Sequence, residues 1–481
     1  MIAPGTGGVR RLDSPGDGQD TPRTNRAGKG SRHGGGQALQ MNRRAATLVA
    51  SLALAASATD ETIQDVPEPD DPASGIEVQL TAGEFEDAAS ASDETIQEAL
   101  EPEDPTSRIE VQLTAGEFAD AATAAEALVE EVEETSGRYG LVLKRPLTLL
   151  GDALLGMGDG PGALAAYDRA LHVARVNRGL FDPDQVDVVY REAVVHATMG
   201  DRVAADARHS YAFSVLLRAY GREDARLVPG LFTLAEWHQE NHRVFSARRL
   251  FDRVVTIAAS QFPSGDPRMI RALRGVAATF RDERFPRNVS ATRNRAAMAS
   301  YRDTNRNRAV DVNNFAPGER ALITVINLQQ ENPDSTNVDI ADGMLELADW
   351  YLLFEKYERA FALYERVWQL LEEDTARRDA TFAAPTPLYL PFPPNPKLPS
   401  DVRREPQTGI VELALAVSDR GKVEELDTVR SEPAGLMDFR LRKLVRRARY
   451  RPAFVDAEPV AAAEVPVEYR FVYVPEEADE T

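Results

Sequence analysis

The sequence contains no cysteine and only six histidines among its 481 residues. Without cysteine the chain can form no disulfide, no thiol nucleophile and no thiolate metal site. A glycine-rich phosphate loop and a G-x-S-x-G nucleophile elbow are also missing. We therefore predict that the chain is not an enzyme and holds no cofactor.

The histidines and acidic residues that are present do not match known metal-binding patterns. His238 and His242 lie one helical turn apart, but no glutamate stands at the position that a zinc-protease helix requires. Residues 303–307 begin like a calcium loop, yet Arg308 stands where glycine is needed and Asn314 where the bidentate glutamate belongs. We predict no metal ligand.

The net charge of −21 is concentrated in one segment. Residues 59–135 carry 24 acidic residues against one basic residue, Arg108, and the chain after them is nearly neutral. Nucleic-acid binding requires a basic surface, and none is indicated. We predict no nucleic-acid partner.

The beginning of the chain has the composition of an export signal. Residues 1–40 are rich in Gly, Arg and Ser, and we predict that they are disordered and not translated in the working protein, which would start at Met41. Arg43 and Arg44 precede a short apolar run that ends in Ala56-Ser57-Ala58, so residues 41–58 form the predicted signal peptide. Fourteen apolar residues are fewer than the roughly 20 that span a bilayer. We expect a periplasmic protein with no membrane span in the mature chain. Alternatives are an uncleaved inner-membrane anchor and an ordinary alanine-rich helix.

The acidic segment contains a tandem duplication. Residues 60–64 recur at 93–97 and residues 76–85 recur at 109–118, with an offset of 33 residues in both cases. We predict a largely disordered acidic segment over 59–116, in which each copy carries a short strand or turn. Only the second copy continues into a long helix, Ala119 to Glu134.

Small residues then recur at a fixed spacing of 42. One series is Gly151, Ala193, Ala235 and Ala277, and a second series, offset by 12 residues, is Ala163, Ala205 and Ala247 after Ala121. Apolar residues at helical spacing surround each position, so the pattern predicts repeated pairs of helices that cross closely at the small residues. We predict an all-α solenoid over 117–373, with five units and a leading half-repeat.

The fourth unit departs from this spacing. Its first helix is anchored at Ala277, whereas its second helix is predicted at Gly318 to Gln330, anchored at Ala321. The difference implies an insert over 283–316, which we predict to be a long loop with local helix.

These units resemble tetratricopeptide (TPR) repeats. The matching positions are Leu150-Gly151, Leu154, Gly158-Asp159, Ala163, Tyr167, Ala170, Leu234-Ala235, His238, Ala247, Phe251, Leu347-Ala348, Tyr351, Ala360 and Tyr364. The spacing exceeds the usual value of about 34 and resembles the long TPRs of kinesin-light-chain type.

The resemblance implies a concave groove, lined by the first helix of each pair, that binds peptides. The implied groove residues are Thr148, Asp152, Leu155, Tyr190, Val194, Phe232, Glu236, Gln239, Leu345, Asp349 and Leu352. This mixture of apolar and acidic residues favours a peptide with some basic character. The alternative is that these residues merely cover the helices.

After the solenoid the composition changes twice. Residues 380–407 contain eight prolines, which predicts a semi-rigid Pro-rich linker over 374–396. Alternating Val411, Leu413, Leu415 and Val417 then predict a strand, followed by a second strand over 422–431, a helix from Met437 to Ala448 and a last strand within 459–473. We predict a small α+β module of order β-β-α-β over 397–474, before an acidic tail at 475–481.

This module resembles the TonB C-terminal domain. The matching features are Leu398-Pro399, Gly409, the hairpin at 419–423, Ser431, Tyr450-Arg-Pro452 and the closing strand 465–471. The resemblance implies that the module binds an extended segment of an outer-membrane transporter by strand addition. The implied contact residues are Pro399, Arg403, Tyr450, Pro452, Val465, Val467, Tyr469 and Phe471. Leu398 stands where the family usually has tyrosine and Arg403 where it has glutamine, which leaves partner specificity open.

These features predict a periplasmic scaffold or adaptor protein that binds proteins or peptides, among them outer-membrane transporters. The alternative is a TonB-family energy transducer that supports transmembrane transport through outer-membrane receptors, which would need residues 41–58 as a retained anchor. A hydrolase that uses the 283–316 insert is the remaining alternative.

We predict that the mature protein begins at Thr59, because the small-residue site at 56–58 is the expected cleavage point. N-terminal sequencing of the protein purified from its own cell envelope measures this directly. A chain that retains residues 41–58 would favour the anchored transducer instead.

Overall fold

The computed structural model describes residues 104–286, 314–396 and 406–475. Several expectations therefore lie outside the described residues. These are the disordered residues 1–40, the signal peptide, the first acidic copy, residues 287–313 of the insert, and the acidic tail from 476.

The described chain begins with two helices, α3 (Pro105–Ala115) and α4 (Phe118–Ser136). Asp104 caps α3 by accepting a hydrogen bond from the Ser107 backbone N–H, and Gly116 ends it with a left-handed φ of 81°. Ile109 is 1% exposed and packs with residues of α4 and α5. The expectation of a strand or turn in this second acidic copy is therefore wrong, because Ile109 and Leu113 lie one helical turn apart and pack on the neighbouring helices. The long helix after it is confirmed.

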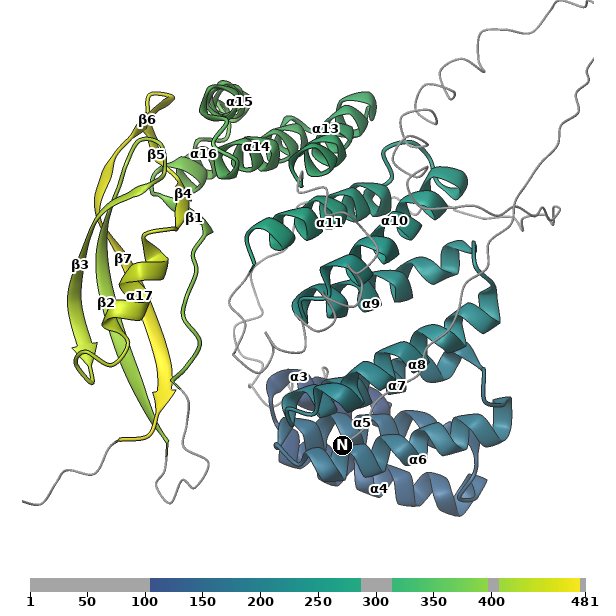
Figure 1. The fold of residues 1–481 in the computed structure, drawn as a ribbon. Coiled ribbons are helices and arrows are strands. Elements are labelled where there is room, and N and C mark those ends of the chain that lie inside the picture. The colour runs from purple at the N-terminus through teal and green to yellow at the C-terminus, as the bar shows by residue number, and fades with distance from the viewer. Residues whose placement is uncertain (1–103, 287–313, 397–405, 476–481) are drawn as a thin grey trace, which may run out of the picture. The chain divides into compact units, whose positions relative to one another are not determined.

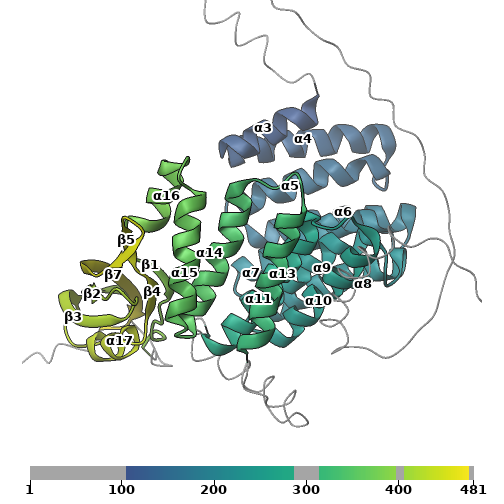
Figure 2. The same ribbon diagram turned by 90° about the horizontal axis from the view of Figure 1, so that it is seen from above.

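Five helix pairs follow, and they confirm the predicted units (Figures 1 and 2). The pairs are α5 (Lys144–Gly156) with α6 (Gly160–Arg178), α7 (Val186–Thr198) with α8 (Arg202–Tyr220), α9 (Val228–Glu240) with α10 (Val244–Gln261), α11 (Pro267–Arg284) with α13 (Phe315–Glu331), and α14 (Asn337–Leu353) with α15 (Tyr357–Leu370). Short 3-10 helices η1 (Leu141–Leu143), η2 (Pro183–Gln185) and η3 (Ala225–Leu227) precede α5, α7 and α9.

The small residues lie where the paired helices cross. The alanines of both series are at most 3% exposed. At Gly151 an added Cβ would lie 2.3 Å from the Tyr167 ring, so a larger residue would push α5 and α6 apart. The fourth unit is also as predicted, since α11 packs against α13 although residues 285–314 separate them in sequence.

The Pro-rich linker is only partly a linker. Residues 375–382 form α16 (Thr375–Phe382), and residues 386–389 form strand β1 (Thr386–Tyr389). Phe382 is fully buried in the solenoid core, whereas Leu390 and Phe392 pack against the core of the C-terminal module. The expectation of a separating spacer is wrong for these residues, because some of their apolar side chains pack on the solenoid core and others pack on the core of the C-terminal module.

The C-terminal module has the predicted β-β-α-β order. Strands β2 (Gln407–Val417), β3 (Val423–Glu432) and β7 (Ala462–Tyr473) form an antiparallel sheet of order β3-β2-β7, with α17 (Asp438–Val445) on one face (Figure 1). The alternating residues of β2 are at most 1% exposed and pack against Leu441 and Val445 of α17. Three short strands were not predicted: β4 (Arg449–Arg451) pairs with β1, and β5 (Ala453–Val455) pairs with β6 (Glu458–Val460).

Across residues 104–286, 314–396 and 406–475, none of the helices is both long and apolar enough to span a membrane.

One carboxyl group is buried inside the solenoid. Glu192 of α7 is fully buried, and its Oε2 lies 3.2 Å from Nε of Arg208. The pKa of Glu192 is raised to about 7, mainly because the carboxyl group is buried, while the positive charge of Arg208 opposes the shift.

We predict that Glu192 makes the protein less stable at pH 8 than at pH 5. Its pKa in the folded state is about 7 against 4.5 in the unfolded chain, so its contribution is fully present below pH 4.5 and is lost as the pH rises through 7. The loss should reach about 2–3 kcal/mol. Urea unfolding of the native chain and of Glu192→Gln at both pH values measures it, with Glu126→Gln on the exposed side of α4 as control. An unchanged pH slope in Glu192→Gln would contradict this assignment.

Candidate functional site

The predicted acidic groove residues are each paired with a cation from a neighbouring element. Asp152 of α5 accepts a 2.8 Å bond from Arg191 of α7 and a 2.6 Å bond from the Tyr167 hydroxyl. Glu236 of α9 pairs with Arg271 of α11, while Gln239 donates to Asp282 at 2.7 Å. Because these carboxylates are neutralised within the protein, the groove does not present the free acidic surface that a basic peptide would need.

The predicted apolar groove residues differ in how accessible they are. Phe232 and Leu352 are 4% and 0% exposed and belong to the solenoid core, and Thr148 is also buried. Tyr190, Leu155 and Leu345 are half-buried against that core. Val194 is 50% exposed and is the most accessible apolar side chain of the set.

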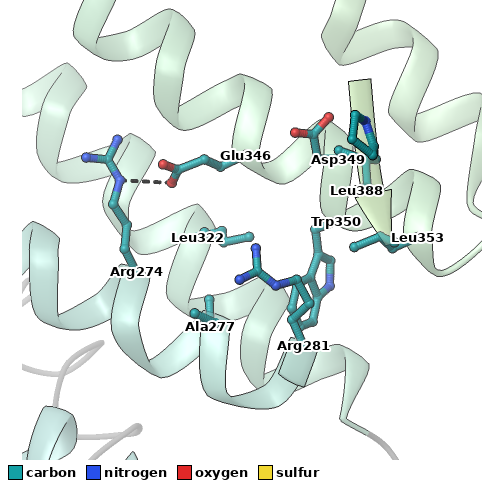
Figure 3. A pocket seen from close by; sticks show the side chains of 11 residues that line it. Arg274, Ala277, Arg281, Leu322, Glu346, Asp349, Trp350, Leu353 and Leu388 are labelled. Carbon is teal, nitrogen blue, oxygen red and sulfur yellow. Dashed lines mark hydrogen bonds and ion pairs between the residues drawn. The ribbon is translucent and has the colours of Figure 1, made fainter. Parts of the chain in front are cut away.

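A cavity of about 310 Å³ lies between α11, α13, α14 and β1 (Figure 3). Arg274 donates to Glu346 at 2.8 Å, and burial raises the pKa of Glu346 while the charge of Arg274 lowers it. Figure 3 shows the Arg281 side chain beside Trp350 and Leu322. Arg281 Nε lies 3.5 Å from Oδ1 of its sequence neighbour Asp282. The cavity is therefore lined by charges of both signs together with apolar side chains such as Leu322, Trp350 and Leu353.

In the C-terminal module most of the predicted contact residues form the core. Tyr450, Val467, Tyr469 and Phe471 are at most 7% exposed, Pro452 is buried, and Val465 is half-buried. The Tyr469 hydroxyl donates to the Pro393 carbonyl at 2.9 Å, and Phe392 stacks on the Tyr469 ring at 5.5 Å. Pro399 and Arg403 lie outside the described residues.

Strand β7 has a free edge within the described part of the chain, since it pairs there only with β2. Pro466 lies in this strand opposite Ala414. Proline has no N–H, and in a strand it is tolerated where that position faces away from the ladder. Glu468, Arg470 and Val472 share the orientation of Pro466 along the pleat, so their backbone groups point to the free edge.

A groove of about 520 Å³ runs beside the first half of β7. Pro385, Pro387, Leu390 and Phe392 line one wall, and residues 462–468 of β7 line the other. Tyr450 also lines it, burial raises the pKa of its phenol to about 12, and its hydroxyl has no partner among the described atoms. A free strand edge beside an apolar groove can accept an extended segment by main-chain hydrogen bonding.

His238 lies near the end of α9, and His242 follows that helix. Burial, with the charge of Arg243, lowers the pKa of His238 to about 4. Over the described ranges, there is no group of three or more His, Asp or Glu residues that could hold a metal ion.

Comparison with known proteins assigns the C-terminal module. Residues 394–471 match the family model of the Gram-negative bacterial TonB protein C-terminal. The module is a TonB C-terminal domain. The helix pairs before it form an α-solenoid of TPR-like units. No protein among the curated sequences matches the chain.

Solved structures similar to this chain include two proteins with helical repeats. One is a putative kinesin light chain from Podosopora anserina with nearly identical TPR-like repeats, 14% identical, with a TM-score of 0.35 over 49% of this chain and 100% of that one. Another is BtubC (BKLC) from P. vanneervenii, 13% identical, with a TM-score of 0.38 over 62% of this chain and 98% of that one. These scores are low, and the fold assignment depends on the helix pairs themselves.

The TonB C-terminal domain is joined to the last TPR unit by a buried ion pair. Arg451 of β4 is 8% exposed, and it donates two hydrogen bonds to Asp349 of α14, at 2.9 and 2.7 Å, and one to the Thr381 carbonyl at 3.1 Å. The Tyr364 hydroxyl of α15 donates to the same carboxylate at 2.8 Å. Burial and the charge of Asp349 raise the pKa of Tyr364 well above its usual value.

Apolar and close backbone contacts surround this pair. Phe454 of β5 is 5% exposed and packs edge-on against Tyr364 and Phe382, with ring centroids 5.2 and 4.9 Å apart. Gly421 has a φ of 70°, and a Cβ there would lie 1.8 Å from the Tyr450 carbonyl oxygen. At the rim, Glu355 pairs with Arg449 at 3.0 Å and Lys422 at 3.3 Å.

Sequence reasoning missed this junction. It placed Asp349 in the peptide groove and Tyr450-Arg-Pro452 at a partner site, whereas the structure brings Asp349 and Arg451 together. One signal was available, since Arg451 is a cation flanked by the apolar residues Tyr450, Pro452 and Phe454, which indicates a buried partner of opposite charge.

We predict that Arg451→Gln lowers the free energy of unfolding by about 3–5 kcal/mol, because it leaves the buried Asp349 carboxylate without its counter-charge. Arg449→Gln is the matched control, since its partner Glu355 is half exposed and the pair should contribute about 0–1 kcal/mol. Urea unfolding of the full chain measures both. Equal losses of unfolding free energy in the two variants would contradict the prediction, because the buried pair would then stabilise the protein no more than the exposed pair.

Proposed function

We propose that the protein is a non-enzymatic periplasmic scaffold whose TonB C-terminal domain binds a protein partner by strand addition. The observation that carries the proposal is the free edge of β7 beside the apolar groove at residues 385–392. An extended segment placed there gains main-chain hydrogen bonds from the edge and side-chain contacts from the groove. The TPR solenoid contributes a second surface for protein or peptide partners.

The family match supports outer-membrane transporters as the partner class, because it is to a Gram-negative envelope domain. The same match supports the runner-up function, an energy transducer for transport through outer-membrane receptors. A transducer must pass movement from the inner membrane to the domain, which requires residues 41–58 as an anchor. Cleavage after Ala58 would leave a scaffold.

Of the groove residues that the TPR resemblance implies, we retain only the accessible apolar ones as peptide contacts. Val194 and the half-buried Tyr190 and Leu155 offer apolar contact area to a peptide on the first helices. Asp152, Glu236 and Asp349 serve instead to hold neighbouring elements together. A peptide partner of the solenoid is therefore selected by apolar contacts more than by basic charge.

We predict that Arg470→Pro weakens partner binding at least about tenfold, because it removes an outward-pointing backbone N–H from the free edge of β7. Arg470→Ala is the matched control, since it removes the same exposed side chain, which pairs with the neighbouring Glu468, but keeps the N–H. The probes are fluorescein-labelled peptides that copy the extended N-terminal segments of outer-membrane transporters, measured by anisotropy with the full chain. Equal affinities of the two variants would contradict strand addition at this edge. Circular dichroism verifies that both variants are folded.

A further inference from the structure

The exposed side of α17 combines large apolar and basic side chains. Met437, Leu441 and Val445 face the core and are at most 1% exposed. Asp438 and Arg442 face β3, where Asp438 accepts a 2.6 Å bond from Ser431. The positions left over on the helix point outward, and Phe439 among them is 76% exposed.

Basic residues continue this outward face through the turn after α17. Lys443 and Arg446 follow Phe439 at i+4 and i+7, so the three side chains lie along one line of the helix surface. Arg440 and Arg447 lie beside that line, and Leu436, which precedes the helix, is 41% exposed. We call these residues the α17 patch: Leu436, Phe439, Arg440, Lys443, Arg446 and Arg447.

Within the described residues, the cations of the patch have no carboxylate partner. Among the residues that the structure describes, no carboxylate lies within 4.0 Å of Arg440, Lys443, Arg446 or Arg447. The arginines on the first helices of the solenoid differ in this respect, since Arg191 and Arg271 each pair with a carboxylate of a neighbouring helix. Four free cations on two helical turns create a local positive field.

We propose that the α17 patch docks the TonB C-terminal domain on an anionic phospholipid surface. A bilayer interface offers negative headgroups to the four cations and an apolar region to Phe439 and Leu436, so it satisfies both halves of the patch at once. A nucleic acid needs a longer basic track than two helical turns. Surface docking would hold the free edge of β7 close to membrane proteins, but it does not depend on strand addition.

The experiment uses the full chain and sedimentation with sucrose-loaded vesicles. We expect binding to vesicles of phosphatidylglycerol and phosphatidylcholine in equal parts, little binding to pure phosphatidylcholine, and release in 0.5 M salt, about three times the ionic strength of physiological solution. The triple variant Arg440→Ser, Lys443→Ser, Arg446→Ser should bind at least about tenfold more weakly. The matched control, Arg249→Ser, Arg320→Ser, Arg366→Ser, makes the same change of charge on the solenoid and should bind like the native chain.

A second readout tests the apolar half of the patch. The variant Phe439→Trp should show a blue shift of its added tryptophan fluorescence with anionic vesicles, which the native chain with its Trp237, Trp350 and Trp368 should not show. Equal binding by the two triple variants would overturn the proposal. Binding that appears only after deletion of residues 59–103 would assign the patch to the chain's own acidic segment, and binding to heparin without binding to vesicles would assign it to polyanions in general. Either result would also overturn it.

Discussion

The buried pair of Arg451 and Asp349 joins the TonB C-terminal domain to the last helix pair of the solenoid. Two opposite charges are stable in a nearly dry site only when their hydrogen bonds are satisfied, and here Thr381 and Tyr364 supply the remaining bonds. The pair fixes β4 against α14, β4 holds β1, and the aromatic contacts of Phe454 close the apolar end of the last helix pair. A solenoid must cover its terminal repeat to stay soluble, and in this chain the TonB C-terminal domain does so.

Ion pairs also connect neighbouring helices along the solenoid, but these pairs are more exposed. A repeat of 42 residues places equivalent helices side by side. An arginine in one first helix can therefore reach a carboxylate in the preceding first helix, as Arg191 reaches Asp152 and Arg271 reaches Glu236. These pairs are partly exposed, and each contributes little stability alone. Their larger effect is on recognition, because they remove the acidic character that the groove has in the sequence.

The fold could be predicted largely from the sequence because it depends on local patterns. Alanines every 42 residues mark helix crossings, and the alternation of Val411 to Val417 marks a half-buried strand. The site could not be predicted to the same extent, because accessibility depends on contacts between distant segments. Leu352 occupies a groove position of the repeat but is buried. Tyr450 is also buried, because Gly421 packs closely against its backbone carbonyl and β1 pairs with it. The Pro-rich residues 385–393 illustrate the same limit, since composition indicates a spacer whereas their apolar side chains pack on the module.

The groove beside β7 lies against the segment that connects the two parts of the chain. Pro385, Pro387, Leu390 and Phe392 line the groove, and this segment contains β1, which pairs with β4. An extended segment bound in the groove therefore contacts the chain that connects the domain to the solenoid. Because the buried ion pair holds β4 against α14, a segment bound in the groove would lie on the part of the chain that joins the domain to the last helix pair. In the proposed scaffold, such a junction would lower the conformational entropy lost when two partners bind at once, compared with a loose joint.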